Sequence, residues 1–357
     1  MTVGTVCYAT EQGLGHLAKS FYDAGMIDRV LIFRHPHGDR PTQLGWYPEG
    51  TPILQYRPFV GPAVDAFLDA VDVVLFFETP FDWSFLDRCR AMNVKTVLIP
   101  MYEWFPESKV GKRAFDQMIF PSSLDAEYFR DEYPTARTIP VPVENDVLSR
   151  GRVRTTATTF VHNAGGIGSR NHKGTEEVLR AIPLVKNPSA RFVVRSQNGT
   201  GLQTLLVNMD ETEREAIRAM ETDGRVRFEF GPVPRENLFS EGDAYVAPEK
   251  YNGLSLPLQE AYASGMPVIA THRKPMTDWL PTDLLVEPDS TRKVRVAPGH
   301  LVIDECVVSP EKIAAKIDEV AGTNVTLRSQ EGIAWGRAHS WEMLRPFYVE
   351  ALAEVLS

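Results

Sequence analysis

A glycine-containing stretch at residues 162–174, HNAGGIGSRNHKG, follows a short apolar run and precedes a helical pattern. Glycines let backbone amides approach an anion closely, while a helix N-terminus or a cationic side chain neutralises its charge. Gly166, Arg170 and Lys173 are therefore candidate anion-binding residues, and a surface loop with ordinary solvated cations is the alternative. The stretch lacks the G-x-G-x-x-G spacing of a dinucleotide-binding turn followed by an acidic residue about twenty positions later, which argues against a dehydrogenase.

A second candidate is Glu260, which lies in the first turns of a helix predicted at residues 256–263. This helix follows a strand predicted at 244–247 and a loop that contains Asn252. In a parallel α/β sheet such a loop lies at the carboxyl edge of the strands, where ligands bind. The alternative is a structural role, in which Glu260 only offsets the positive end of the helix dipole.

Two further candidate groups follow predicted strands in the first half of the chain. The turn QGLGH contains Gly13 and Gly15, which permit close approach of a phosphate or another ligand, and His16, which either binds that ligand or caps the helix. The stretch MYEWF places aromatic rings beside Glu103, a combination that suits a sugar or another hydroxylated ligand. Packing between domains is the alternative for the second group.

Apolar runs of strand length alternate with helical patterns along the chain. Strands are predicted at residues 3–9, 30–33, 73–77, 96–100, 118–120, 159–162, 191–195, 226–230, 244–247 and 267–270. The runs are continuous rather than alternating, which indicates sheets covered on both faces. We therefore expect an α/β protein with two Rossmann-like, doubly wound parallel-sheet domains that face a cleft, at residues 1–150 and 151–335, and a C-terminal helix at 336–357 that packs back on the first domain.

The composition fits a soluble enzyme better than a fibrous, disordered or membrane-spanning chain, since 43% of residues are hydrophobic and 24% are charged. The net charge is −9 and both halves are acidic, which argues against a protein that binds duplex DNA. The three cysteines are far apart and form no CxxC pair, so neither a disulfide framework nor a zinc site is expected. Because no secretory signal is seen, we expect a cytoplasmic location.

The stretch from Pro248 to Ala270 resembles the donor-site signature of retaining glycosyltransferases with the GT-B fold, especially family 4, the group 1 glycosyltransferases. The family pattern is Pro-Ser-x-x-Glu-Gly-Phe-Gly-Leu-x-x-x-Glu-Ala-x-Ala-x-Gly-x-Pro-Val-Ile-Ala. The matching positions are Pro248, Gly253, Leu256, Glu260, Ala261, Ala263, Gly265, Pro267, Val268, Ile269 and Ala270. The resemblance covers about residues 158–271. It implies a GT-B fold, which consists of two Rossmann-like domains, and a nucleotide sugar bound by the second domain.

The resemblance also implies roles for particular residues. Glu260 would accept hydrogen bonds from the ribose hydroxyls, and Lys173 with its loop would bind the diphosphate. The remaining predicted donor-site residues are Gly253, Leu254, Ser255 and Leu256. Two departures from the pattern stand out: the first Glu of the family's acidic pair is Asn252, and the Arg expected five positions before the Lys is a glycine. Arg170 or Arg195 could replace that arginine, and Glu249 or Glu103 could supply the missing acid.

The implied reaction moves a sugar from a UDP- or GDP-sugar to an unidentified acceptor hydroxyl, with retention of configuration. No cofactor is expected beyond this co-substrate, and the absence of an Asp-x-Asp sequence favours a metal-independent reaction. The acceptor is a glycan, a protein, a small molecule or, less readily, modified DNA, and no stable membrane insertion is expected. Two alternatives remain: a sugar-nucleotide 2-epimerase of the same fold, and a non-catalytic protein that binds sugar nucleotides or glycans.

Overall fold

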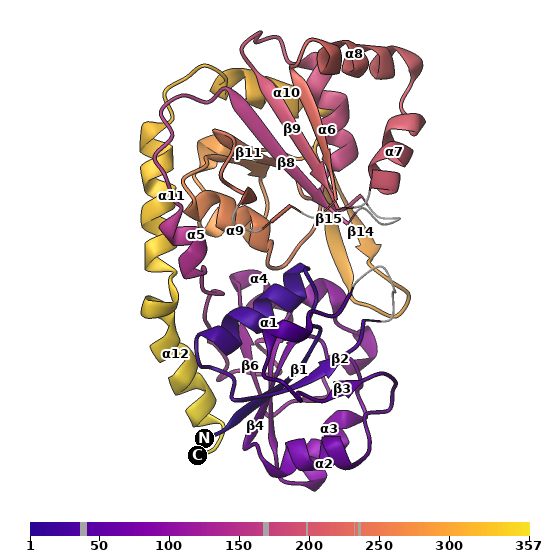
Figure 1. Ribbon diagram of the computed structural model, residues 1–357, viewed down its shortest axis with the longest axis vertical. Helices are drawn as coiled ribbons and strands as arrows, with labels where there is room; N and C mark the ends of the chain where they lie inside the picture. Colours follow the sequence, from indigo (N-terminus) through magenta and orange to yellow (C-terminus); the bar gives the residue numbers. More distant parts are fainter. Residues whose placement is uncertain (36–40, 167–170, 198, 232, 235–236) are drawn as a thin grey trace. The chain divides into compact units, whose positions relative to one another are not determined.

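The computed structural model describes residues 1–35, 41–166, 171–197, 199–231, 233–234 and 237–357. The chain divides into two compact units (Figure 1). The segments of unit 1 are Met1–Pro142, Arg295–Val302 and Trp341–Ser357, and those of unit 2 are Val143–Val294 and Ile303–Ser340. The first boundary therefore falls after Pro142, before the expected one, and unit 1 also contains two later segments of the chain.

Unit 1 is built on a seven-stranded parallel sheet with the strand order β3-β2-β1-β4-β5-β6-β7. The strands are β1 (Val3–Cys7), β2 (Arg29–Phe33), β3 (Ile53–Leu54), β4 (Val73–Glu78), β5 (Lys95–Pro100), β6 (Gln117–Phe120) and β7 (Arg137–Thr138). The helices of this unit are α1 (Gly13–Asp23), α2 (Pro62–Asp69), α3 (Phe85–Ala91), α4 (Ser123–Phe129) and α12 (Trp341–Glu354). Every residue of β1 is buried, as expected for a strand covered on both faces.

The last helix, α12, packs on the elements that begin the chain. The indole Nε1 of Trp341 donates a hydrogen bond of 2.8 Å to the Ser20 hydroxyl on α1. The buried Tyr348 hydroxyl donates to the carbonyl of Ile139 at 3.1 Å. The C-terminus of the chain therefore lies beside its N-terminus (Figure 1).

Unit 2 contains a six-stranded parallel sheet with the order β10-β9-β8-β11-β12-β13. The strands are β8 (Thr159–Gly165), β9 (Arg191–Ser196), β10 (Val226–Phe230), β11 (Ala244–Ala247), β12 (Val268–Thr271) and β13 (Leu285–Val286). The helices are α5 (Asn145–Ser149), α6 (Thr175–Ala181), α7 (Gly199–Asn208), α8 (Glu211–Thr222), α9 (Leu256–Ala263), α10 (Pro310–Val320) and α11 (Thr326–Ala338). A separate two-stranded sheet joins β14 (Ser290–Arg295) to β15 (Val302–Val307).

The sheet of unit 2 has an apolar core on each face. Phe160 and Val194 belong to one core, while the next and the preceding residues, Val161 and Val193, belong to the other. Successive residues of a strand point to opposite faces, so strands buried on both sides must be apolar throughout. This confirms the predicted α/β class with two doubly wound parallel sheets.

The ten predicted strands are all present, whereas the two-residue strands β3, β7 and β13 and the polar pair β14 and β15 were not predicted from the sequence. A two-residue strand is too short to give a hydrophobic pattern, and β14 has the sequence STRKVR. In the part of the chain that the structure describes, no helix is both long and apolar enough to cross a membrane.

The polar segment at 150–154, which sequence analysis treats as a linker, contains one buried cation. Arg150 and Arg152 are exposed, but the Arg154 side chain is only 2% exposed. Its guanidinium donates hydrogen bonds to the carbonyls of Arg152, Phe239, Gly242 and Ser264. Burial lowers the pKa of Arg154 to about 10, so it stays charged at neutral pH. Arg154 therefore ties the first residues of unit 2 to the ends of its central elements.

Replacing Arg154 with Met should lower the free energy of unfolding by on the order of 3 kcal/mol, because several buried carbonyls lose their donor. The exposed Arg152→Met variant is the control and should change it by less than about 0.5 kcal/mol. Urea denaturation followed by circular dichroism measures both. Equal effects of the two substitutions would contradict the assigned role of Arg154.

Candidate functional site

The strand order of unit 2 reverses between β8 and β11. From β8 the chain moves outward to β9 and β10, then returns to the other side of β8 to form β11. At such a reversal the connections that leave the carboxyl ends of the two neighbouring strands diverge, which makes this the ligand-binding position of doubly wound sheets. The segments that follow β8 and β11 are the two that the sequence singled out, at residues 166–174 and 248–255.

These two segments contact each other through Gly174 and Pro248. Gly174 has a left-handed conformation, with φ of +71°, and lies at the N-cap of α6. A Cβ at this position would be 2.3 Å from the Pro248 carbonyl oxygen, so only glycine fits here. Beside it, the Lys250 amide donates to the His172 carbonyl at 2.8 Å. The sequence indicated a glycine turn here, but it did not show that this turn packs against the end of β11.

Lys173 projects from this turn to Glu249, the second residue after β11. The Lys173 Nζ to Glu249 Oε1 distance is 2.6 Å, and the side chains are 19% and 4% exposed. Burial by itself would raise the pKa of the Glu249 carboxyl, but the charge and hydrogen bond of the Lys173 ammonium hold it below its usual value. The Glu249 carboxylate is therefore ionised, and it forms an ion pair with Lys173 at the point where the strand order reverses.

Glu260 occupies the fifth position of α9 and is 7% exposed. It lies beyond the first turn, where the helix dipole acts most strongly, so favourable interaction with that dipole is a weak explanation for a buried carboxylate. The helix starts after Ser255, which has a left-handed conformation with φ of +47°. Two residues of the loop before the helix that were predicted to bind the donor, Gly253 and Leu254, are buried. Leu256, another predicted donor-site residue, is the first residue of the helix and is partly buried.

Asn252 shapes this loop with its own side chain. Its Oδ1 accepts hydrogen bonds from the amides of Leu254 at 3.1 Å and Ser255 at 2.9 Å. Its carbonyl accepts a hydrogen bond of 3.0 Å from Arg273. The side-chain oxygen is thus engaged with the backbone, which leaves the Nδ2 amide as the group of Asn252 that can still donate to a ligand.

Arg273 is a residue of this region that the sequence did not single out. It follows β12, is 8% exposed, and donates from Nε to the Glu249 carbonyl at 3.2 Å as well as to Asn252. Arg273 therefore holds the carbonyl groups at both ends of the segment 249–252. Its place three residues after a predicted strand was the available signal.

Two arginines, Arg170 and Arg195, were proposed to replace the family's arginine, and the structure describes only Arg195. Arg195 on β9 is 4% exposed; it donates to Glu229 at 2.6 Å and to the Leu238 carbonyl at 2.6 Å. Its guanidinium is therefore engaged with Glu229 on β10 and with the segment before β11. Arg170 lies outside the described residues, and Gly166 is exposed at the end of β8.

His162, on β8, connects β11 to the start of α6, directly after the Lys173 turn. Its Nδ1 is 2.8 Å from the Val246 carbonyl oxygen, and its Nε2 is 2.9 Å from the Thr175 hydroxyl. A carbonyl only accepts, so Nδ1 carries the proton and Nε2 accepts from Thr175. Burial lowers the pKa of His162 to about 4, and the imidazole is therefore neutral at pH 7.

This His162 environment predicts a specific pH dependence. An unfolded histidine has a pKa of about 6.5, so between that value and about 4 the unfolded chain binds the extra proton. Stability should therefore fall by up to about 3 kcal/mol as the pH drops through this range. The His162→Gln variant lacks this contribution. Urea denaturation of both proteins from pH 7 to pH 4 should show that their free energies of unfolding approach each other as the pH falls. A difference between them that does not depend on pH would refute the assignment.

Unit 1 has its own reversal between β1 and β4, where Gly13, Gly15 and His16 follow β1. A Cβ on Gly15 would be 2.2 Å from the Thr10 carbonyl oxygen, so this glycine is required by packing within the turn. His16 Nε2 is 3.0 Å from a Glu11 carboxylate oxygen. The predicted turn is present, and its second glycine has a structural reason.

Glu103 lies in a 3₁₀ turn after β5 and is 4% exposed. Two other carboxyls follow the neighbouring strands: Glu78 ends β4 with φ of +65°, and Asp125 lies in the first turn of α4. Burial, and next the Glu103 charge, raise the pKa of Glu78 to about 8. The pKa of Asp125 is also raised by burial, against the hydrogen bond from Ser122. Glu103 is therefore part of a carboxyl cluster with Glu78, which follows the sequence pattern of the neighbouring strand in the same way, and with Asp125, which the sequence did not single out.

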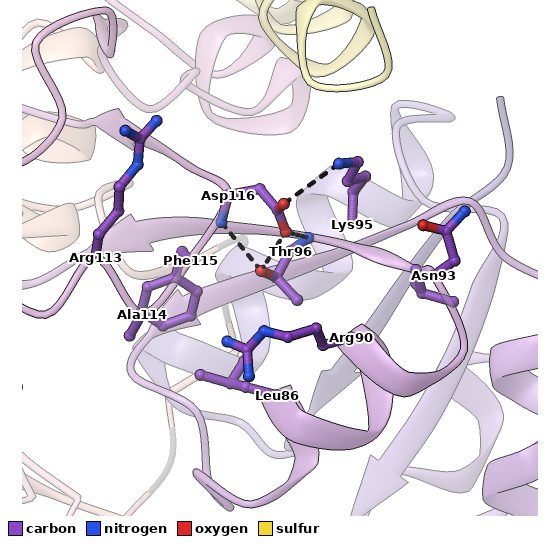
Figure 2. Close-up of a pocket in the computed structure, with 10 residues that line it drawn as sticks. Leu86, Arg90, Asn93, Lys95, Thr96, Arg113, Ala114, Phe115 and Asp116 are labelled. Atoms are coloured by element: carbon purple, nitrogen blue, oxygen red, sulfur yellow. Dashed lines mark hydrogen bonds and ion pairs between the residues drawn. The ribbon is translucent and has the colours of Figure 1, made fainter.

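No group of three or more histidine, cysteine or carboxylate side chains suited to a metal ion occurs among the described residues. A pocket of about 380 Å³ in unit 1 lies instead at the amino ends of β5 and β6 (Figure 2). Its residues include Arg90, Arg113 and Asp116, and Asp116 is bonded to Thr96 and lies 3.5 Å from Lys95. A second pocket, of about 720 Å³, lies at the amino ends of the unit 2 strands. Neither contains a predicted site residue.

Comparison with known proteins bears on the family resemblance and on the fold. Residues 160–301 match the family model of the glycosyl transferases group 1. None of the curated proteins matches the chain. Among solved structures, a glycosyltransferase from Rickettsia africae is 14% identical with a TM-score of 0.68, and the alignment covers 100% of this chain and 98% of that one.

Two further structures cover nearly the whole chain. Anabaena Alr3699/HepE, solved in complex with UDP and glucose, is 13% identical with a TM-score of 0.66 and coverage of 99% and 100%. The sucrose-phosphate synthase of Thermosynechococcus elongatus is 14% identical with a TM-score of 0.60 and coverage of 100% and 99%. At these identities the structural likeness shows the fold alone. The resemblance to the group 1 glycosyltransferases is thus confirmed over residues 160–301, and the GT-B fold over the whole chain.

Proposed function

We propose that this protein transfers a sugar from a UDP-sugar to an acceptor hydroxyl, with the donor bound by unit 2. The observation that carries the proposal is that the Lys173 turn and the loop at 248–255, which leads into the helix of Glu260, follow the neighbouring strands β8 and β11 and contact each other. A nucleotide sugar needs a cationic contact for its diphosphate and an acceptor for its ribose hydroxyls. In the proposed site Lys173 supplies the cationic contact, and Glu260, on the helix that follows the 248–255 loop, supplies the acceptor.

The preference for UDP over GDP rests on the Anabaena protein, which was solved with UDP and glucose. In the proposed complex, Lys173 binds the diphosphate and Glu260 accepts hydrogen bonds from the ribose hydroxyls. As the bond between sugar and phosphate breaks, negative charge grows on the departing phosphate, and a cation placed there beforehand stabilises it. Because Lys173 can supply this charge, we propose a reaction that does not depend on a metal.

We further propose that the sugar is transferred with retention of configuration. The departing phosphate would take the proton of the acceptor hydroxyl on the same face of the sugar, which explains how the chain could work without a dedicated base in unit 2. Unit 1 would bind the acceptor, with Glu103 and the neighbouring carboxyls as hydrogen-bond partners for hydroxyl groups. Carboxyls with raised pKa values can both donate and accept such bonds.

Removing either charged group should weaken nucleotide binding. Lys173→Ala and Glu260→Ala each delete a charge-assisted hydrogen bond, so each should reduce affinity for UDP by about 1.5–3 kcal/mol. Isothermal titration calorimetry with UDP measures this directly. Uridine separates the two variants, because it retains the ribose but has no phosphate: Glu260→Ala should weaken its binding, and Lys173→Ala should not.

A thermal-shift screen of UDP-, GDP-, ADP- and TDP-sugars tests the proposed function itself. A ligand at a hundredfold excess over its Kd stabilises the folded protein by about 2.7 kcal/mol. If no nucleotide sugar raises the melting temperature, the donor site is assigned wrongly. If one binds but no acceptor panel gives turnover, the non-catalytic sugar-nucleotide-binding function is favoured instead.

Asn252→Asp tests whether position 252 contacts the donor sugar. Aspartate keeps the oxygen that caps Leu254 and Ser255 but removes the Nδ2 donor. If that amide binds the sugar, the kcat/KM values for different UDP-sugars should change relative to one another by about tenfold, while affinity for UDP stays within about twofold. Asn252→Ala is the comparison that also loses the cap. Equal losses for UDP and for UDP-sugars would place Asn252 in a purely structural role.

A further inference from the structure

The ion pair between Lys173 and Glu249 is a feature in which this chain departs from the family it resembles. The family pattern has a serine after the proline at the end of the strand, whereas this chain has Glu249. A neutral hydroxyl is thus replaced by a carboxylate, 2.6 Å from the cation that we assign to the diphosphate. The local charge at that cation is therefore different from the one that the pattern implies.

Glu249 is held in place at several points. Its amide donates to the Ala247 carbonyl at 2.8 Å, and its own carbonyl accepts from Arg273 at 3.2 Å. The residue is 3% exposed. Lys173, which has a longer and more exposed side chain on a turn, is therefore the partner that can reorient when a ligand arrives, while the carboxylate stays near the site.

Lys173 is the main group that stabilises the charge of Glu249. Its charge and hydrogen bond lower the pKa of this buried carboxyl most, and the Ser255 hydroxyl and the nearby His172 side chain lower it less. The other lysine of these loops, Lys250, is paired with Glu177 at 2.7 Å, with both side chains largely buried. An anion that binds Lys173 must therefore share it with an adjacent carboxylate.

The donor and the nucleotide product differ in charge. The terminal phosphate of a free nucleoside diphosphate has a second pKa of about 6, so UDP has about one more negative charge at pH 7.5 than a UDP-sugar, whose two phosphates are both esterified. A fixed carboxylate near the diphosphate repels the product more strongly than it repels the donor. Its position relative to Lys173 therefore gives it a means to distinguish the two.

We propose that Glu249 competes with the diphosphate for Lys173 and selectively weakens the binding of the nucleoside diphosphate product, so that the product leaves after sugar transfer. This inference rests on the proposed function, since it assumes that Lys173 contacts the diphosphate. Glu249 acts in it as a specificity-determining residue through charge, without touching the reacting atoms.

The test is the Glu249→Gln variant, which keeps the size and an oxygen acceptor for Lys173 but removes the charge. Calorimetry with UDP, UDP-glucose and uridine should show UDP affinity rising by on the order of tenfold, UDP-glucose affinity rising less, and uridine affinity unchanged. The inhibition constant of UDP in the transfer reaction should fall by the same factor. Glu249→Ser, which restores the residue of the family pattern, should shift UDP affinity in the same direction and serves if the Gln variant folds poorly.

Glu213→Gln is the matched control. Glu213 pairs with Arg180 at 2.6 Å in the same unit, on α8, so its loss changes the net charge equally but should leave the ratio of UDP to UDP-glucose affinity unchanged. The inference is overturned if Glu249→Gln weakens UDP binding as Lys173→Ala does, or changes both affinities by the same factor. If the wild-type protein binds none of the UDP, GDP, ADP or TDP ligands, the proposed function fails first, which is a different result.

Discussion

The approach of the turn at 171–174 to the carboxyl end of β11 is the constraint on which the candidate site depends. Gly174 has no side chain and adopts a positive φ, so it can lie against the Pro248 carbonyl, where any Cβ would collide. This contact determines the position of the Lys173 backbone. His162 stabilises the same region through its hydrogen bonds to Val246 and Thr175. A larger residue at 174 would move the cation as well as the turn.

The electrostatics of this region follow from the same arrangement. The chain has a net charge of −9, yet the proposed ligand is an anion, so binding must depend on local cations rather than on the overall field. Those cations are paired with carboxylates of neighbouring segments, Lys173 with Glu249 in the loop after β11 and Lys250 with Glu177 in the first turn of α6. Such pairing allows lysines to be largely buried without a ligand, because an unpaired buried charge is costly.

The two units use the same topology to present different chemistry. In unit 2, a lysine and an ionised glutamate lie at the strand reversal. In unit 1, the carboxyl ends of β4 and β5 and the start of α4 place Glu78, Glu103 and Asp125 near one another, and burial raises the pKa of Glu78 and Asp125. In the first set the Lys173 cation suits a charged diphosphate, and the second set suits neutral hydroxyl groups, which is the basis of the proposed division between donor and acceptor.

The sequence by itself determined the fold class, the ten main strands and the two motifs of unit 2, because continuous apolar runs, turn glycines and the spacing from Pro248 to Ala270 are local signals. It could not show that Arg154 is buried, that Arg195 is bound to Glu229, or that the Asn252 oxygen caps its own loop. Nor could it pair Lys173 with Glu249, which are 76 residues apart. Only the strand order decides which loops become neighbours, and that order depends on how whole sheets pack rather than on any local pattern of residues.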